Sequence, residues 1–124
     1  MNIFITTGAF FGALGIIIGA FGAHALKKIF NDDQLKNFET GVKYQMYHAL
    51  LLVLVGFNLK FITNYQNLIY YSLTLGIMLF SFSIYGLCIS GALNKKLKIL
   101  GPVPPIGGLL LFLSWILLIL NSIY

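Results

Sequence analysis

Charged side chains are scarce in this sequence of 124 residues, of which 9% are Asp, Glu, Lys or Arg and only three are acidic. Water-soluble domains are about one-quarter charged, whereas 59% of this chain is hydrophobic. This composition excludes a water-soluble enzyme and a disordered tail. It also excludes a nucleic-acid partner, since a net charge of +5 spread over short loops lacks the clustered basic face of a folded domain. We expect the chain to reside in a bilayer.

Acidic residues are missing from every long uncharged stretch, and cysteine occurs only once, at Cys88. A small proton-coupled exporter generally needs an intramembrane carboxylate, and thiol–disulfide chemistry needs a pair of cysteines. The sequence also lacks a nucleophile and base at motif spacing, a glycine-rich phosphate loop and a metal-ligand cluster. We therefore predict no catalytic residue, no metal and no cofactor, and we interpret Cys88 as a small buried apolar residue.

The charges that are present separate four apolar stretches. They fall within residues 27–43, at Lys60 and within residues 95–98. A helix needs roughly 20 apolar residues to cross the hydrocarbon core. The sequence therefore predicts an all-α fold, a single transmembrane domain over residues 1–124 that forms a four-helix antiparallel bundle. The predicted elements are spans at 3–26, 45–62, 68–92 and 103–123, an interfacial amphipathic helix at 32–44, and a turn at Thr63, Asn64, Gln66 and Asn67.

The distribution of lysines predicts the orientation. With four spans, the loops 27–43 and 95–98 share one face and carry every lysine except Lys60. Short loops rich in lysine stay on the cytoplasmic side. We expect these loops to be cytoplasmic and both termini outside, in a bacterial plasma (inner) membrane whose lipids are the first partners. We also expect the first span to be retained, because residues 1–5 lack the basic start of a signal peptide.

Small residues form a stripe along each of two predicted spans. At about 100° per residue, both stripes fall within an arc of roughly 80°. The first comprises Gly8, Gly12, Gly15, Gly19 and Gly22, and the second comprises Ser72, Gly76, Ser83, Gly86 and Ser90. Small residues let helix backbones approach closely in lipid, so we predict that spans one and three pack on each other. A homo-oligomer contact and a pore lined by glycine are the alternatives.

The hydrophilic segment after the first span has the local signals of a helix. Asn31 and Gln34 fit a capping box, and acidic residues follow Asn31 directly. Glu39 and Lys43 are four residues apart and are predicted to pair. This helix could also dock a partner. Further along the chain, the run Gly101–Pro105 is interpreted as the start of the last span, because proline is tolerated in a first helical turn; a discontinuous helix that forms a ligand site is the alternative.

Two histidines are the best candidates for chemistry, because both lie near the predicted cytoplasmic interface. The candidate polar pocket consists of His24, Glu39, Lys43, Tyr44, Gln45 and His48. It would suit a headgroup, an ion or a polar solute, whereas the simpler interpretation is a set of interfacial hydrogen-bonding groups. A bis-histidine haem is a further alternative, and two ligands are too few to indicate zinc. Trp115 lies deep in the last span and is assigned no function.

Several segments resemble one family along the whole chain. They are residues 19–27 (GAFGAHALK), 38–50 (FETGVKYQMYHAL), 80–85 (FSFSIY) and the proline-glycine run at 101–108. The chain is similar to the transmembrane protein 256 family, also known as domain of unknown function 423, and departs from it at Phe82, where many members carry glycine. The resemblance implies a small polytopic membrane protein of bacteria and mitochondria-bearing organisms, without an established activity.

Together these features favour a non-enzymatic membrane protein that binds lipid or a partner through its cytoplasmic His/Tyr/Glu face. The alternative from another class is a transporter or channel for a small solute or ion, with cargo unknown. That alternative would need a hydrated cavity reaching His24 and His48.

Overall fold

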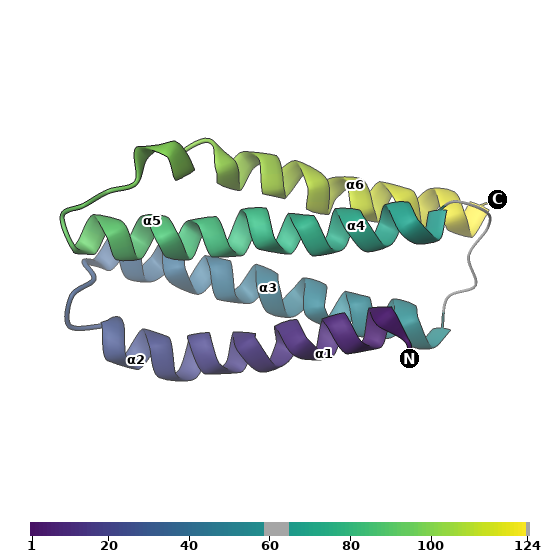
Figure 1. Ribbon diagram of the computed structural model, residues 1–124, viewed down its shortest axis with the longest axis horizontal. Helices are drawn as coiled ribbons and strands as arrows, with labels where there is room; N and C mark the ends of the chain where they lie inside the picture. Colours follow the sequence, from purple (N-terminus) through teal and green to yellow (C-terminus); the bar gives the residue numbers. More distant parts are fainter. Residues whose placement is uncertain (59–64, 124) are drawn as a thin grey trace.

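The computed structural model describes residues 1–58 and 65–123 and shows a helical protein (Figure 1). The first pass along the molecule consists of α1 (Ile3–Ile16), the π-helical turn η1 (Ile17–Gly22) and α2 (Ala23–Leu26), and α3 (Asp32–Asn58) runs back in the opposite direction. The third pass consists of α4 (Tyr65–Ile77), the π-helical turn η2 (Met78–Phe82) and α5 (Ser83–Ala92). A 3₁₀ turn, η3 (Lys98–Leu100), leads into α6 (Val103–Ile123). The all-α prediction is confirmed.

The helices form two antiparallel hairpins that lie against each other. Figure 1 shows α1 and α2 beside α3, and α4 and α5 beside α6, with both chain ends on the side opposite the α2–α3 loop. The Asn2 side chain caps α1 by accepting from the Phe4 and Ile5 amides at 3.1 and 3.3 Å. Its Nδ2 donates to the Gly56 carbonyl at 2.9 Å. The start of α1 is thereby fixed to the end of α3.

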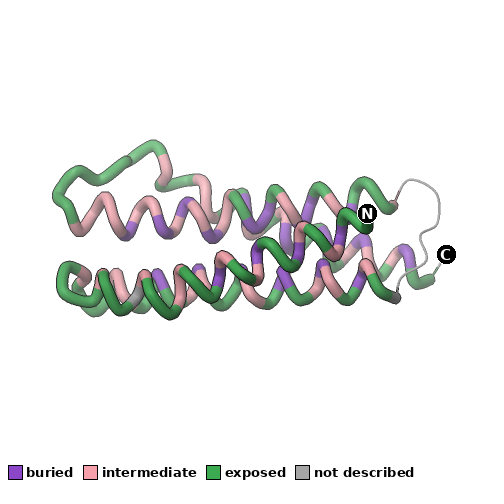
Figure 2. Tube along the Cα trace, turned by 60° about the horizontal axis from the view of Figure 1, so that its bottom comes forward, coloured by how far each residue is buried: buried purple, intermediate pink, exposed green. Residues whose placement is uncertain are grey.

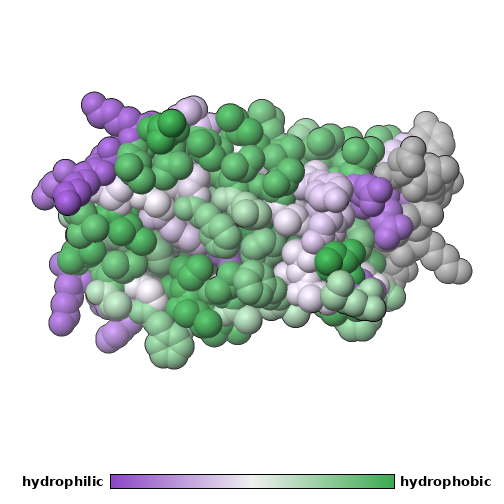
Figure 3. All heavy atoms as spheres, in the orientation of Figure 1, coloured by the Kyte–Doolittle hydropathy of each residue, from purple (hydrophilic) through white to green (hydrophobic). Residues whose placement is uncertain are grey.

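Within the described residues, three helical stretches are long and apolar enough to cross a bilayer: Ile3–Leu26, Tyr65–Ala92 and Lys98–Ile123. Large apolar residues lie on the outer surfaces of these stretches: Phe21 is 70% exposed and Phe112 is 63% exposed. Figure 3 shows hydrophobic side chains over most of the visible face, hydrophilic ones projecting at one end and a smaller hydrophilic group toward the other. The predicted second span, 45–62, begins within α3, but its last four residues, which include Lys60, lie outside the described residues, as do Thr63 and Asn64 of the predicted turn. Gln66 and Asn67, also expected in that turn, lie in the first turn of α4 instead.

The helix α3 begins where the capping box predicts. The Asn31 Oδ1 atom accepts from the Gln34 amide at 2.8 Å, and the Gln34 Oε1 atom accepts from the Asn31 amide at 3.0 Å. The amphipathic helix expected at 32–44 runs directly into the span expected from 45, because one continuous helix extends from Asp32 to Asn58. No proline interrupts this stretch, so the change from polar to apolar residues leaves its backbone hydrogen bonds intact.

The first half of α3 also packs closely against its neighbours. A Cβ built on Gly41 would lie 2.8 Å from the Tyr85 Cε1 atom of α5, and Phe38 is 1% exposed. Phe38, Tyr85 and Cys88 form a small apolar cluster near the α2–α3 loop. A larger cluster includes Phe11, Leu52 and Leu111, from three different helices. Figure 2 shows the buried positions on the sides where the helices face one another.

Phe82 lies between these two clusters and packs partly against both. Its ring centroid is 6.0 Å from that of Phe11 on α1 and 5.8 Å from that of Tyr85 on α5. Phe82, where the resemblance leads us to expect glycine, therefore fills space between the two hairpins with an aromatic ring.

The glycine stripe of the first span packs against α3, which corrects the predicted pairing with the third span. A Cβ on Gly8 would lie 2.8 Å from the Ala49 carbonyl oxygen, and one on Gly19 would lie 2.9 Å from Val42 Cγ1. A Cβ on Gly15 would meet the Met46 sulfur. Gly22 is looser, and Gly12 faces open space with nothing within 4 Å. Antiparallel neighbours joined by a short loop provide the nearest partner for such a stripe.

The small residues of the third span have other neighbours. A Cβ on Gly76 would lie 2.7 Å from Leu111 Cδ2 on α6, and one on Gly86 would lie 2.8 Å from Leu100 Cδ1 on η3. The hydroxyls of Ser72, Ser83 and Ser90 donate to carbonyls three or four residues earlier in their own helix. The glycines of this stripe thus contact α6 and η3, while its serine hydroxyls donate within the span.

The last helix begins as predicted from its prolines. Pro104 and Pro105 lie in the first turn of α6, where a missing backbone N–H costs nothing. Gly107 follows them and is buried against η2, because a Cβ there would lie 2.6 Å from the carbonyl carbon of Leu79. This is among the closest backbone approaches between helices in the described part of the chain.

Candidate functional site

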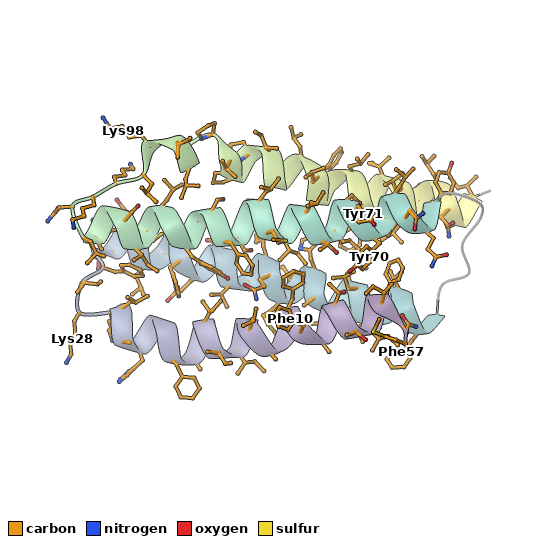
Figure 4. The ribbon with its side chains drawn as sticks, viewed as in Figure 1. Phe10, Lys28, Phe57, Tyr70, Tyr71 and Lys98 are labelled. Carbon is orange, nitrogen blue, oxygen red and sulfur yellow. The ribbon has the colours of Figure 1, made fainter. Side chains whose placement is uncertain are left out.

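The end of the molecule that carries the loops 27–31 and 93–97 is referred to below as the lysine-bearing end. Figure 4 shows Lys28 and Lys98 projecting from it, while Phe57, Tyr70 and Tyr71 lie toward the opposite end. The two lysine loops therefore share one end, as the four-span prediction requires. No ion pair forms among the charged side chains that the structure describes, and the predicted Glu39–Lys43 pair is absent within this set. These charges are free to meet solvent, lipid or ligand.

Two hydrogen-bonded pairs, Gln45 with Tyr85 and His48 with Trp115, are together called the inner polar cluster. Gln45, His48 and Tyr85 are buried, whereas Trp115 is 46% exposed. Gln45 is 0% exposed. Its Nε2 atom donates to the Phe11 carbonyl at 2.8 Å, and its Oε1 atom accepts from the Tyr85 hydroxyl at 2.6 Å. A buried amide without such partners would be costly. The two hydrogen bonds that satisfy the Gln45 amide therefore also connect α3 to α1 and α5.

His48 faces the other hairpin. The Trp115 indole N–H, which can only donate, lies 3.2 Å from the His48 Nε2 atom. Nε2 must therefore be the unprotonated acceptor, and Nδ1 carries the proton that it donates to the Tyr44 carbonyl at 2.7 Å. Both nitrogens of a neutral imidazole are occupied. His48 consequently has no lone pair left for a metal or haem iron, and the bis-histidine alternative does not fit these residues.

The six residues of the predicted pocket are divided among four environments. His24 is exposed on α2 and makes no hydrogen bond to the residues that the structure describes, and Gln45 and His48 are buried in the inner polar cluster. Tyr44 is 41% exposed and packs against Phe80 with tilted rings whose centroids are 4.9 Å apart. Only Glu39 and Lys43 remain together at a surface. A single pocket containing all six is not formed in the described structure.

Glu39 and Lys43 line a groove of about 340 Å³ between η1 and α3. Phe38 and Val42 form its apolar wall, and Gly19 contributes a position without a side chain. Because Val42 Cγ1 already lies 2.9 Å from where a Gly19 Cβ would be, the glycine keeps this groove open. The groove thus combines a carboxylate, an ammonium group and an apolar wall.

A larger cavity, of about 620 Å³, lies on another side of α3 and was not predicted. It lies between the start of α3 and the end of α5 and is lined by the polar residues Gln34, Asn37, Asn94 and Lys96. Sequence spacing could not reveal it, because the loop from Leu93 to Pro102 is what closes it. Trp115 and Tyr85, which complete the inner polar cluster, were likewise missed. The only available signal for them was a polar atom on an aromatic ring deep within an apolar span.

Metal binding has no support from the described side chains. Within residues 1–58 and 65–123, no group of three or more His, Cys, Asp or Glu residues is placed to hold an ion. Cys88 is buried, as predicted, and its sulfur donates to the Gln34 carbonyl at 3.4 Å.

Comparison with known proteins identifies relatives over almost the full chain. The family described as "Protein of unknown function (DUF423)" matches residues 18–108. The chain is 36% identical over 122 residues to the UPF0382 membrane protein SH2409 of Staphylococcus haemolyticus, covering 98% of this chain and 96% of that protein. It is 35% identical over 125 residues to the UPF0382 membrane protein YwdK of Bacillus subtilis, covering 99% and 98%. No solved structure matches the chain.

Proposed function

Because the chain belongs to the DUF423 family of membrane proteins of unknown function, we propose that it is a non-enzymatic membrane protein that binds a phospholipid with a zwitterionic headgroup in the groove beside Glu39 and Lys43. It crosses a bacterial inner membrane four times as an antiparallel bundle, with α3 as the second crossing. The lysine-bearing end is cytoplasmic and both termini are outside, following the lysine bias.

The observation that carries this proposal is the unpaired acid and base in one groove. Along α3, Glu39 lies about 10 Å and Lys43 about 16 Å from Asp32, at 1.5 Å per residue. Both charges therefore lie beside the apolar surface of η1 and α2 rather than at the tip of the molecule. A charge at such depth is costly unless it finds a partner.

A zwitterionic headgroup supplies both partners in one molecule. Its phosphate is attracted to the Lys43 ammonium and its own ammonium to the Glu39 carboxylate, while Phe38 and Val42 contact its upper acyl carbons. The lipid reaches the groove laterally, because the groove opens between two helices at the protein surface. Transport, the alternative, would need a hydrated path to His48, and Trp115 lies against that histidine.

The test is a titration of the detergent-solubilised full chain with phosphatidylethanolamine, followed by native mass spectrometry. Lys43→Gln and Glu39→Gln should each weaken binding about fivefold, the factor expected for one charge near a headgroup. Lys36→Gln and Asp33→Asn are matched controls, because they make the same charge changes on α3 outside the groove. These two controls should stay within about twofold of the wild type. Equal losses in test and control variants would contradict a defined site.

A further inference from the structure

The unpredicted cavity at the lysine-bearing end has polar walls that belong to three separate segments. Gln34 and Asn37 come from the first turns of α3, and Asn94 and Lys96 from the loop that follows α5. None of the lining residues that the structure describes is acidic. The cavity is therefore a set of amide groups and one ammonium, at the end of the molecule where Lys27, Lys28, Lys95 and Lys98 add positive charge.

The loop that carries Lys96 is held in a defined shape. Asn94 has a φ of 60°, a left-handed conformation that asparagine adopts more readily than most residues. The Lys95 amide donates to the Ser90 carbonyl at 2.9 Å and the Asn94 amide to the Gly91 carbonyl at 3.2 Å, which is the hydrogen-bond pattern of a Schellman helix end. The Leu97 amide also donates to the Ser90 hydroxyl, at 3.2 Å. Lys96 thus lies between two fixed positions.

Gln34 presents a donor to the same space. Its Oε1 atom is occupied by the Asn31 amide in the capping box, so the Nε2 group is left to donate. This nitrogen would lie 3.3 Å from a Cβ on Gly91, which is a lining residue of the cavity. The glycine therefore leaves the amide uncovered, and the amide is free for an acceptor such as a phosphate oxygen.

A smaller and more apolar cavity adjoins the first. This second cavity has a volume of about 210 Å³ and shares Asn37, Leu87 and Cys88 with the first. Ile84 and Pro104 are among its other lining residues. A wide polar space at the membrane surface that narrows into an apolar one matches the two ends of an amphiphile.

We propose that these joined cavities are a second lipid site, which takes a phosphate-bearing lipid with a net negative headgroup. The phosphate lies in the larger cavity, where Lys96 balances its charge and the Gln34 amide donates to it. One acyl chain enters the smaller cavity beside Leu87 and Cys88. This site is separate from the groove beside Glu39 and Lys43, because its second wall is α5 instead of η1.

The experiment is a titration of the full chain in mild detergent with phosphatidylglycerol, again read by native mass spectrometry. Lys96→Gln should weaken binding about fivefold. Lys95→Gln is the matched control, since it removes the same charge from the neighbouring residue, which does not line the cavity; it should stay within about twofold. Equal weakening by both variants would show only general attraction to the positive end and would overturn the site.

Two further arms identify the ligand. Glycerol phosphate carries the same phosphate chemistry without acyl chains, and it should fail to displace the lipid at a hundredfold excess; efficient displacement would overturn a lipid ligand in favour of a soluble phosphate compound. Lys43→Gln should leave phosphatidylglycerol binding unchanged. Loss of binding in that variant would overturn the separation of the two sites, whereas the phosphatidylethanolamine titration tests the first site independently.

Cys88 gives a second readout of occupancy, because it is the only cysteine and lines both joined cavities. Bound phosphatidylglycerol should slow the modification of Cys88 by a small thiol reagent at least fivefold relative to phosphatidylethanolamine. Equal rates in the two lipids would contradict an acyl chain beside Cys88.

Discussion

Replacement of Gly107 by alanine should separate α6 from η2. A Cβ on Gly107 would lie 2.6 Å from the carbonyl carbon of Leu79 and 2.7 Å from the Phe80 Cα. Both are backbone atoms, which cannot rotate away as a side chain can. Restoring an ordinary contact of about 3.5 Å requires α6 and η2 to move apart by about 1 Å. A gap of this size costs the neighbouring atom pairs about a quarter to a half of their dispersion energy. Overpacking of this kind costs about 1–3 kcal/mol, and we expect the upper part of that range.

The neighbouring glycine provides the control. A Cβ on Gly108 would lie 3.6 Å from the Phe80 Cδ1 atom, an ordinary contact. Alanine is also the better helix former by about 1 kcal/mol, so Gly108→Ala should be neutral or slightly stabilising. Unfolding of both variants in mixed micelles with increasing dodecyl sulfate can be followed by the fluorescence of Trp115, the only tryptophan. If Gly107→Ala unfolds at the same detergent fraction as Gly108→Ala, the close approach of α6 to η2 is refuted.

Three further predictions follow from contacts elsewhere in the chain. Gly8→Ala should lower thermal stability of the solubilised protein by about 1–3 kcal/mol, because its Cβ would meet the Ala49 carbonyl oxygen, whereas Gly12→Ala faces open space and should not; equal melting would contradict the packing of α1 on α3. Tyr85→Phe should cost about 1–2 kcal/mol in the wild type but less in a Gln45→Leu background, and additive effects in this double-mutant cycle would exclude the hydrogen bond. A C-terminal alkaline phosphatase fusion should be active and a green fluorescent protein fusion dark, while the reverse would invert the proposed orientation.

Signals that act over a few residues were readable from the sequence. The capping box at Asn31 and Gln34 was predicted correctly because both partners lie within one helical turn. The start of α6 was predicted because Pro104 and Pro105 restrict their own backbone. The confirmed membrane character also depends only on composition, which needs no knowledge of which helices touch.

The sequence did not indicate which helix each packing face contacts. The stripe that includes Gly8 and Gly15 showed which face of the first helix packs, but nothing in its spacing distinguishes α3 from α4 as the partner. Similarly, His24 and His48 were grouped because of their similar depth, although depth does not fix the direction in which a side chain points. His48 faces Trp115 on α6 and His24 is exposed on α2.

The course of α3 past residue 44 was readable as well. The sequence changes there from polar to apolar, but backbone hydrogen bonds do not depend on side-chain polarity, and the amphipathic helix runs into the expected span as far as Asn58. The cavity beside Lys96 was not readable, because its walls combine the start of α3 with residues of α5 and of the loop after it.

The central claim is that the lysine-bearing end binds membrane phospholipid at defined positions. Native mass spectrometry of the chain extracted directly from its membrane into mild detergent tests this claim most directly, and it reports the number of subunits in the same spectrum. We expect one or two phospholipid adducts per chain, reduced by Lys43→Gln and Lys96→Gln but retained in Lys36→Gln and Lys95→Gln. A bare chain, or adducts that all four variants reduce equally, would contradict it.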